Sequence, residues 1–319
     1  MPYYLAIDGG GTKTRCLLAD ETTVLANAMA GGSNMVRLGE QSAREALHTA
    51  VRRVCTTAKI SPAQIRAVCI GAAGAARPEI ATKIRNILAE ITTGATPANI
   101  EVVGDAEIAL EAAFGAAPGV IVIAGTGSIA YGRDAAGRIV RAGGWGFAIS
   151  DEGSGHWIGR RAISAVVNAH DQSGETALAA MILQAWKITA LDELVQQANS
   201  TPPPDFPRLF PVVLRAAAEG DAMARDLLAE AGAKLAGLAA IVVRRLAPQT
   251  SVAGPVAGPL AVPVVPVAVA VAMTGSVFRQ SAVVREIFYN TLERSFPGID
   301  VRQELVDPVQ GALTRARQK

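Results

Sequence analysis

The sequence is poor in several features that mark whole classes of protein. It has three cysteines, Cys16, Cys55 and Cys69, which are widely spaced and set in apolar runs. An odd, scattered set of this kind indicates neither a disulfide framework nor a Cys-x-x-Cys metal site. We therefore expect a protein of a reducing compartment, the cytoplasm.

An excess of charge of one sign is also lacking. The 30 Lys and Arg residues nearly balance the 28 Asp and Glu residues, which leaves a formal net charge of +2 at pH 7. These charges are interspersed, so no basic face of the kind that nucleic-acid binding needs is predicted. We expect a small-molecule partner and no nucleic acid. The sequence allows a homodimer, because dimers are the commonest assembly in general.

Long unbroken hydrophobic runs are missing as well. The one long uncharged stretch, Pro248–Phe278, contains Pro255, Pro259, Pro263 and Pro266. A membrane helix of about 20 residues tolerates such prolines poorly. The first ten residues predict a strand and a turn, without the apolar stretch of a signal peptide. We expect neither a membrane span nor a signal peptide.

The residues that are abundant suit an α/β protein. Hydrophobic residues make up 50% of the chain, mostly as Ala and Val, whereas aromatic residues make up 4%. The 31 glycines predict many tight turns and close approaches of the backbone. A length of 319 residues suits one large domain or two of medium size, and the length prior favours two.

The predicted strands and helices begin with the same pattern twice along the chain. β-prone runs at 3–7, 15–19 and 24–28 predict three antiparallel strands, and helical periodicity predicts a helix over Glu40–Lys59. Further strands are expected at 67–71 and 100–103, and further helices at 80–91 and after Asp105. A second set of three strands covers 120–142, and helices dominate 154–246 with a Pro-rich break at 201–211.

This repetition predicts two related α/β domains. We place the boundary near 115–119, which gives an N-terminal domain of residues 1–116 and a C-terminal domain of 117–319 with helical insertions. The division allows the closing helix, about 307–317, to pack back on the N-terminal domain.

A glycine-rich turn opens each predicted domain. Consecutive glycines let backbone N–H groups converge on a phosphate, because no Cβ blocks its approach. The residues of the first turn predicted to bind ATP phosphates are Gly9, Gly10, Gly11, Thr12, Lys13 and Thr14. Those of the second turn are Gly125, Thr126, Gly127 and Ser128. Asp8, at the end of the first strand, is placed to hold Mg²⁺ through water.

Other interpretations of these turns are open. The first turn would also suit a hairpin that binds no ligand, although Asp8 and the Thr-Lys-Thr run are not needed for a turn. The run from Gly125 to Ala130 fits a dinucleotide fingerprint, but a hairpin follows it where that fingerprint needs a helix. The sequence contains no G-x-x-x-x-G-K-[ST] phosphate loop.

Six motifs occur in an order that resembles one family. They are DGGGTKT from Asp8, Gly32-Ser33-Asn34, Val103-Gly104-Asp105-Ala106, AGTGS from Ala124, Gly143-Gly144-Trp145-Gly146 and Asp151-Glu152-Gly153-Ser154-Gly155. Over nearly the whole chain they resemble the N-acetylglucosamine kinases of the BadF/BadG/BcrA/BcrD ATPase family. The resemblance implies an α/β fold of two ribonuclease-H-like (actin-like ATPase) domains with an interdomain cleft.

The resemblance also implies a reaction, with ATP and Mg²⁺ as cofactors. Asp105 is implied as the general base that takes the proton from the sugar hydroxyl as it attacks the γ-phosphorus. The implied product is N-acetylglucosamine 6-phosphate, with glucosamine or N-acetylmuramic acid as alternative substrates. A helix N-cap is the alternative role of Asp105.

The implied sugar-binding residues are Asp105 itself, Asn34, Gly144, Trp145, Gly146 and Asp151. Carboxylate and amide groups suit the recognition of hydroxyls, because an analogue without the partner leaves buried polar groups unpaired. Three of these residues also have a purely structural alternative. Asn34 would suit a turn, Trp145 core packing and Asp151 a helix cap. The three histidines, His48, His156 and His170, have no metal-ligand spacing.

The implied adenosine-binding residues are Thr274, Gly275, Ser276 and Gly311. Here the chain departs from the family pattern, because a Pro/Val/Ala-rich stretch, Val262–Met273, replaces a strand that ends in two glycines. Two other functions stay open. One is an activator ATPase of the 2-hydroxyacyl-CoA dehydratase type, and the other is a sugar sensor that binds nucleotide without turnover.

Overall fold

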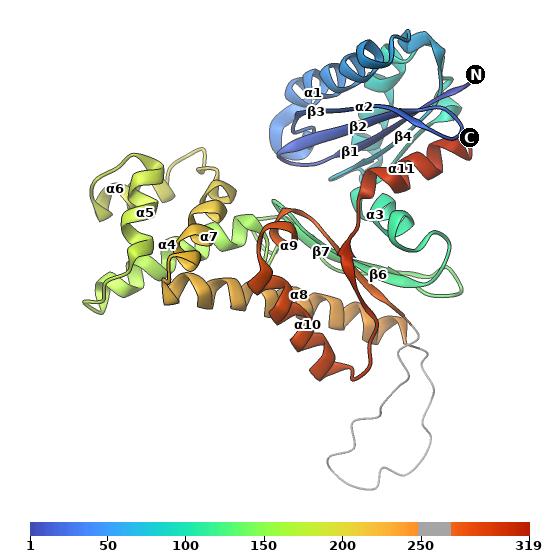
Figure 1. Ribbon diagram of the computed structural model, residues 1–319. Helices are drawn as coiled ribbons and strands as arrows, with labels where there is room; N and C mark the ends of the chain where they lie inside the picture. Colours follow the sequence, from blue (N-terminus) through green and yellow to red (C-terminus); the bar gives the residue numbers. More distant parts are fainter. Residues whose placement is uncertain (248–268) are drawn as a thin grey trace, which may run out of the picture. The chain divides into compact units, whose positions relative to one another are not determined.

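The described residues fold into two compact units (Figure 1). The computed structural model describes residues 1–247 and 269–319. Unit 1 consists of residues 1–117 and 306–319, and unit 2 consists of the described residues between 118 and 305. The chain therefore passes from one unit to the other twice.

Unit 1 is built on a five-stranded sheet with the order β3-β2-β1-β4-β5. Its strands are β1 (Tyr3–Gly9), β2 (Lys13–Ala19), β3 (Val24–Gly31), β4 (Ile65–Ala72) and β5 (Ile100–Gly104). The first three are antiparallel neighbours, whereas β4 and β5 run parallel to β1. The carboxyl ends of β1, β4 and β5 consequently meet at one edge of the sheet.

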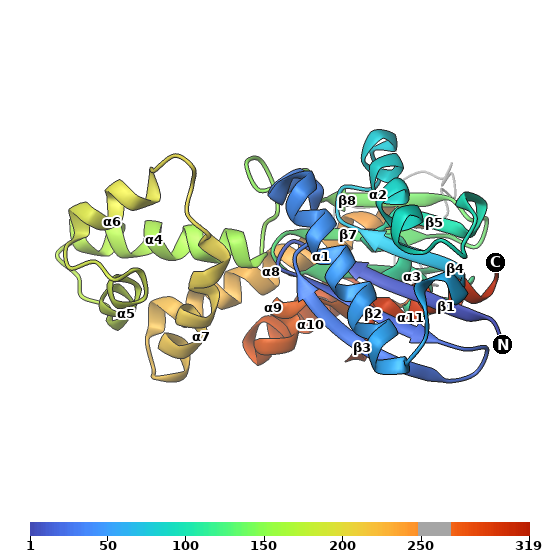
Figure 2. The same cartoon turned by 90° about the horizontal axis from the view of Figure 1, so that it is seen from above.

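Helices cover both faces of this sheet (Figures 1 and 2). They are α1 (Met35–Ala58), α2 (Pro78–Ile91), α3 (Asp105–Phe114) and α11 (Pro308–Arg317). Alternate residues of β1 face opposite sides, as strand geometry requires. Leu5 and Ile7 join a core with α1 and α2, and Tyr4 and Ala6 join a core with α3 and α11.

Helix α1 starts earlier than the periodicity predicts, at Met35 rather than Glu40. It contains a kink at Gly39, whose φ of 81° is not helical. The kink interrupts the apolar pattern, which explains why the sequence signal begins only after it. Short 3₁₀ turns, Pro62–Gln64 and Pro97–Asn99, lead into β4 and β5.

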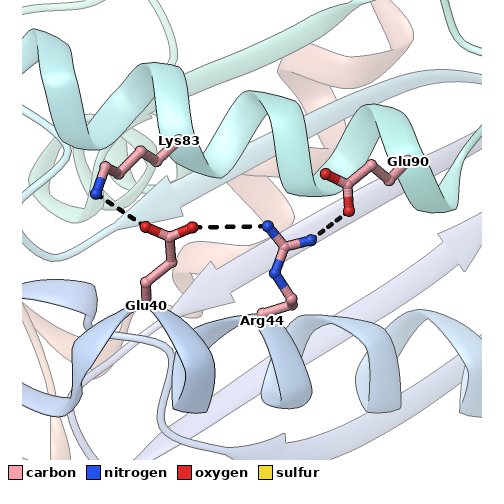
Figure 3. A network of polar contacts seen from close by, with 4 residues as sticks. All are labelled: Glu40, Arg44, Lys83 and Glu90. Atoms are coloured by element: carbon pink, nitrogen blue, oxygen red, sulfur yellow. Dashed lines mark hydrogen bonds and ion pairs between the residues drawn. The ribbon is translucent and has the colours of Figure 1, made fainter.

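A network of charged side chains joins α1 to α2 on the surface of unit 1 (Figure 3). Glu40 accepts a hydrogen bond from Lys83 at 2.8 Å and forms an ion pair with Arg44 at 3.6 Å. Arg44 also binds Glu90. The network is solvent-exposed, so we expect it to orient the two helices while the buried apolar stripe supplies most of the stability.

Unit 2 repeats the sheet topology of unit 1. Its strands are β6 (Gly119–Ala124), β7 (Ser128–Arg133), β8 (Ile139–Gly143), β9 (Val271–Thr274) and β10 (Val301–Leu305). Their order is β10-β9-β6-β7-β8, with antiparallel β6, β7 and β8 and with β9 and β10 parallel to β6. The predicted second set of antiparallel strands is confirmed.

Most of the remaining residues of unit 2 are helical. The helices are α4 (Gly155–Asp171), α5 (Ala177–Trp186), α6 (Leu191–Ala198), α7 (Phe210–Ala218), α8 (Ala222–Leu246), α9 (Ser276–Gln280) and α10 (Ala282–Ser295), with a 3₁₀ turn at Phe206–Leu209. Helix α8 packs on β6, β7 and β8 and against α10, and α4 to α7 pack together and meet α8 through α4 and α7 (Figures 1 and 2). Within 1–247 and 269–319, none of the helices combines the length and the apolar character needed to cross a membrane.

Gly311 allows α11 to pack closely against α3 in unit 1. A Cβ at this position would lie 2.0 Å from the Ile108 carbonyl oxygen and 2.6 Å from the Ala112 nitrogen, both in α3. Real Cβ atoms do not approach backbone so closely, so α11 and α3 can meet here only through glycine.

We predict that Gly311→Ala lowers the free energy of unfolding by at least about 2 kcal/mol, because α11 must move away from α3. The matched control is Gly237→Ala in α8, where a Cβ meets no atom within 4 Å. That change removes a glycine from a helix and should stabilise by about 0.5–1 kcal/mol. Urea unfolding followed by circular dichroism measures both, and a Gly311→Ala protein as stable as the control would contradict the packing account.

Candidate functional site

The first glycine turn connects β1 to β2. It is closed by a hydrogen bond from the Gly10 N–H to the Lys13 carbonyl oxygen at 3.0 Å. A Cβ on Gly9 would lie 2.7 Å from the Ser33 Oγ, so this position has no room for a side chain. Thr12 and Lys13 are exposed, and Thr14 is fully buried.

The segment before α1 braces this turn. The Gly10 carbonyl oxygen accepts hydrogen bonds from the N–H groups of Ser33 at 3.0 Å and Asn34 at 3.2 Å. The Thr14 hydroxyl donates to the Ser33 Oγ at 2.8 Å, and both residues are buried. Ser33 was assigned no role from the sequence, although the Gly-Gly-Ser-Asn run that contains it begins at the end of β3. The turn and Asn34 thus form one rigid piece.

Asn34 is the N-cap of α1. Its Oδ1 atom accepts hydrogen bonds from the N–H groups of Val36 at 3.1 Å and Arg37 at 3.2 Å. The cap fixes the side chain through its oxygen and uses none of its amide donors. The alternative of a plain turn residue is therefore wrong, while the sugar contact stays a prediction.

Asp105 is the first residue of α3, directly after β5. Its Oδ1 atom accepts a hydrogen bond from the Ala106 N–H at 3.0 Å. The N-cap position belongs to Gly104, whose N–H donates to the Glu107 carboxylate at 3.0 Å. Desolvation raises the pKa of Asp105 above its ordinary value. The alternative in which Asp105 serves as the helix N-cap is wrong.

Asp8 lies close to two other carboxylates at the same edge of the sheet. Burial raises its pKa to about 7, and repulsion from Asp105 and Asp307 adds to the rise, while Lys13 and Arg15 oppose it. Carboxylates are gathered in this way where positive charge binds or where protons are transferred.

Arg15 holds the third of these carboxylates. It lies opposite Asp8 in the β1–β2 register, and its Nη1 atom donates to both oxygens of Asp307 at 2.7 Å. Its Nε atom donates to the Asn27 Oδ1 at 3.3 Å. Asp307 precedes α11, so this ion pair fixes the start of that helix beside Asp8. Sequence reasoning missed both Arg15 and Asp307.

The three carboxylates of Asp8, Asp105 and Asp307 do not by themselves form a metal centre. Among residues 1–247 and 269–319, no three or more His, Cys, Asp or Glu side chains are arranged to hold a metal ion. A single carboxylate such as Asp8, acting through water, matches the way that proteins bind Mg²⁺ together with substrate phosphates.

The second glycine turn connects β6 to β7 in unit 2. The Gly125 N–H donates to the Gly127 carbonyl oxygen at 2.9 Å. The start of α4 braces the turn, because Gly155 N–H donates to the Gly125 carbonyl at 2.8 Å and His156 N–H to the Thr126 carbonyl at 3.2 Å. Ser128 donates its hydroxyl to the Glu152 carbonyl at 2.8 Å, so it is held within the protein.

Asp151 lies against this second turn. A Cβ on Gly127 would be 2.8 Å from the Asp151 Oδ2, and Asp151 is buried. Its φ of 71° lies in the left-handed region, which Asp tolerates better than most residues. The N-cap of α4 is Ser154, whose Oγ accepts from the Trp157 N–H at 3.2 Å. A capping role for Asp151 is therefore wrong.

The Gly143–Gly146 segment leaves β8 in a tight turn. Gly143, Gly144 and Gly146 have φ values of 72°, 68° and 102°, which side-chain-bearing residues rarely adopt. Trp145 is 64% exposed, so it is not a core residue and the packing alternative is wrong. The Arg141 guanidinium lies over its ring, 3.9 Å from the centroid.

The residues predicted to bind adenosine are divided between the units. Thr274 ends β9, and Ser276 begins α9. Gly275 between them has a φ of 109°, and a Cβ there would lie 2.2 Å from the Ala124 carbonyl oxygen, beside the second turn. Gly311 lies in unit 1. Of the atypical Val262–Met273 stretch, residues 262–268 lie outside the described residues, and Met273 is buried in β9.

Comparison with known proteins identifies the family. The sequence profile of the BadF/BadG/BcrA/BcrD ATPase family matches residues 5–316. The chain belongs to this family. The match agrees with the two glycine turns, because an ATPase must bind the phosphates of a nucleotide.

Relatives of the chain cover its full length. An N-acetylmuramic acid/N-acetylglucosamine kinase from Clostridium acetobutylicum is 31% identical and covers 99% of each chain. Among solved structures, a Chromobacterium violaceum protein with the provisional name N-acetylglucosamine kinase is 27% identical, with a TM-score of 0.72 and 99% coverage of each chain. A ROK family glucokinase from Streptomyces griseus shares the fold, with a TM-score of 0.57, 18% identity and coverage of 99% and 100%. These likenesses confirm the predicted actin-like ATPase fold class.

The pKa of Asp8 predicts how stability depends on pH. Between its ordinary value near 3.8 and about 7, the folded protein keeps a proton that the unfolded chain loses. The free energy of unfolding therefore falls as the pH rises through this range, by up to about 4 kcal/mol from this group. Asp8→Asn, which resembles the neutral acid, should be more stable than the parent at pH 8 and about equally stable at pH 4.

Urea unfolding at the two pH values measures this difference, and Asp20→Asn is the control. Backbone hydrogen bonds from Thr23 and Thr22 lower the pKa of Asp20, so its ionised form is the stabilising one. Its replacement should lower stability at pH 8, opposite in sign to Asp8→Asn. An Asp8→Asn protein with no gain at pH 8 would show that Asp8 ionises without cost.

Proposed function

We propose that this member of the family is an ATP-dependent kinase that phosphorylates an amino sugar. The observation that carries the proposal is the position of Asp105. It is a desolvated carboxylate at the carboxyl end of β5, near enough to Asp8 for the two charges to repel each other. A general base thus lies next to the residues proposed to bind Mg²⁺ and phosphate. Such a base can serve transfer to a sugar hydroxyl or to water, and the name of the Clostridium acetobutylicum relative favours the sugar.

The proposed phosphate contacts come from both turns. In unit 1, the proposed contacts to phosphate oxygens are the Gly11 N–H and the exposed residues Thr12 and Lys13, and Asp8 would hold Mg²⁺ through water. Gly9 leaves room for a phosphate, while the Gly10 N–H and the Thr14 hydroxyl donate within the protein and shape the turn. In unit 2, Thr126 and Gly127 are the proposed phosphate contacts, with the Thr126 hydroxyl for the γ-phosphate. The Gly125 N–H and the Ser128 hydroxyl donate within the protein and shape the turn. Bound Mg²⁺ supplies neutralisation of the phosphate charge. Backbone donors fixed in advance lose no freedom when the nucleotide binds.

Asp105 accepts the proton of the sugar hydroxyl as that oxygen attacks phosphorus. A sugar hydroxyl is far less acidic than a carboxylic acid, so proton transfer is late and positioning supplies more of the rate. The raised pKa of Asp105 makes it a stronger base than an ordinary carboxylate. Its carboxylate accepts hydrogen bonds from the backbone N–H groups of Ala106, at 3.0 Å to Oδ1, and of Asp105 itself, which fix its orientation.

The proposed acceptor is N-acetylglucosamine, phosphorylated at its 6-hydroxyl. Asn34, Asp105 and Asp151 bind its hydroxyls, and Gly144, Trp145 and Gly146 line the region of the N-acetyl group. The name of the Clostridium acetobutylicum relative supports an amino sugar and includes N-acetylmuramic acid. Glucosamine and N-acetylmuramic acid are therefore the alternative acceptors. Thr274, Gly275, Ser276 and Gly311 stay predictions for adenosine binding, as do the cytoplasmic location and a homodimer.

The activator hypothesis gains no support from the cysteines. Activators of that type hold an iron–sulfur cluster between subunits through cysteine thiolates. Here Cys16, Cys55 and Cys69 are all buried, and burial raises the pKa of each thiol, to about 12 for Cys69. A thiol that is hard to ionise and enclosed in a core does not suit a shared cluster.

We predict that Asp105→Asn lowers kcat for sugar phosphorylation by about 10²- to 10⁴-fold, because an amide cannot accept the proton. Mg-ATP binding should persist, since Asp105 has no proposed role in it. The control is Asp171→Asn, an exposed aspartate at the end of α4. Mass spectrometry of the sugar phosphate measures the rate. Full activity in Asp105→Asn would remove the general base from the proposal.

A panel of acceptors tests the substrate class. With Mg-ATP, N-acetylglucosamine should give the fastest phosphorylation, ahead of glucosamine, N-acetylmuramic acid and glucose. Removal of the metal with EDTA should stop the reaction, and added Mg²⁺ should restore it. If none of the amino sugars is phosphorylated, the proposed function is wrong.

A further inference from the structure

A stacked cation lies beside the proposed sugar residues of unit 2. Val140 and Ala142 of β8 are part of the core that includes α8, so Arg141 between them projects from the opposite face of the sheet. Its guanidinium lies over Trp145, 3.9 Å from the ring centroid. This contact fixes the plane of the guanidinium and leaves its N–H donors along the edge.

Arg141 lacks an acidic partner in the part of the chain that the structure describes. Over residues 1–247 and 269–319, its guanidinium forms neither an ion pair nor a hydrogen bond with another side chain. Arg138, on the same hairpin, does have an acidic partner, because its Nε atom binds the Asp134 carboxylate at 2.9 Å. The charge of Arg141 is thus positioned but not neutralised.

A second guanidinium adds positive charge at the same strand. Arg245, in the last turn of α8, donates from its Nη1 atom to the Arg141 carbonyl oxygen at 3.1 Å. This bond satisfies an edge carbonyl of β8. The bond reaches the backbone of Arg141, so it places a second positive charge at strand β8.

The stacked pair is continuous with the second glycine turn. Gly143, two residues after Arg141, pairs with Ile129, which follows Ser128. Gly127, in the same turn, lies against Asp151. Trp145, over whose ring the Arg141 guanidinium lies, is itself proposed to line the sugar site. An anionic group on a bound sugar would therefore find Arg141 at the border of the same set of residues.

We propose that Arg141, held by Trp145, is a subsite for a carboxylate carried by the amino sugar. This inference rests on the proposed kinase function and extends it. The matching substrate is an amino sugar with an acidic ether substituent, such as the lactyl group of N-acetylmuramic acid. A guanidinium whose donors lie in a fixed plane binds both oxygens of a carboxylate side by side. Arg141 is then the residue that determines the preference between acidic and neutral amino sugars.

The test compares two acceptors in one preparation of enzyme. The ratio of kcat/KM for N-acetylmuramic acid to kcat/KM for N-acetylglucosamine does not depend on the fraction of folded protein. Arg141→Gln should lower this ratio by about tenfold or more, because a charged, two-point contact is lost. Arg141→Lys, which keeps the charge without the planar fork, should lower it less. Arg138→Gln removes one charge from the same hairpin and should leave the ratio as it is.

The outcomes separate this inference from the proposed function. A wild-type enzyme that phosphorylates none of the amino sugars of the panel contradicts the proposed function, and the subsite with it. A wild-type enzyme that phosphorylates N-acetylglucosamine but not N-acetylmuramic acid contradicts the subsite alone. Equal ratios in wild type and Arg141→Gln also overturn it, as does an equal fall in Arg138→Gln, because that would indicate only a general effect of charge.

Discussion

Backbone hydrogen bonds to the two glycine turns are the interaction on which the site depends. In unit 1, Ser33 and Asn34, just before α1, donate to the carbonyl of Gly10. In unit 2, Gly155 and His156, at the start of α4, donate to the carbonyls of the second turn. Each turn is therefore fixed by the start of a helix. The proposed sugar contacts Asn34 and Asp151 lie close to these same helix starts, so phosphate-binding and sugar-binding residues share one support in each unit.

The second constraint is electrostatic. Asp8, Asp105 and Asp307 meet at one edge of the unit 1 sheet, where burial and mutual repulsion raise the pKa of Asp8 to about 7. Arg15 neutralises Asp307, which leaves the other two carboxylates for chemistry. Such an arrangement costs stability in the free protein, as functional sites often do. The cost is the expected consequence of keeping a base and a magnesium ligand close together.

Much of the fold could be predicted because its signals are local. The strands around both turns and the helix after Asp105 follow from periodicity and glycine spacing, and the two related α/β domains follow from their repetition. The actin-like ATPase fold class followed from the resemblance of the motifs to a known family. The ion pair of Arg15 with Asp307 could not be predicted, because the two residues are 292 positions apart and no local pattern relates them. The early start of α1 was hidden by the kink at Gly39.

The candidate site was predicted in part for the same reason. Residue types at strand ends indicated Asp8 and Asp105, and the family resemblance indicated Asp151, but neither showed which of them cap helices. That role depends on which residue occupies the N-cap position. Here Gly104 occupies it in α3 and Ser154 in α4. The exposure of Trp145 likewise follows from the φ values of the glycines around it rather than from its own type.

The central claim is that the phosphate turns and Asp105 serve transfer to a sugar rather than hydrolysis. The most direct measurement is to quantify ADP and phosphorylated sugar in the same reaction, with Mg-ATP in the presence and absence of N-acetylglucosamine. The account predicts that ADP and sugar phosphate form in equal amounts, and that little ADP forms without the sugar. ADP released at the same rate in both reactions, with no sugar phosphate, would contradict it.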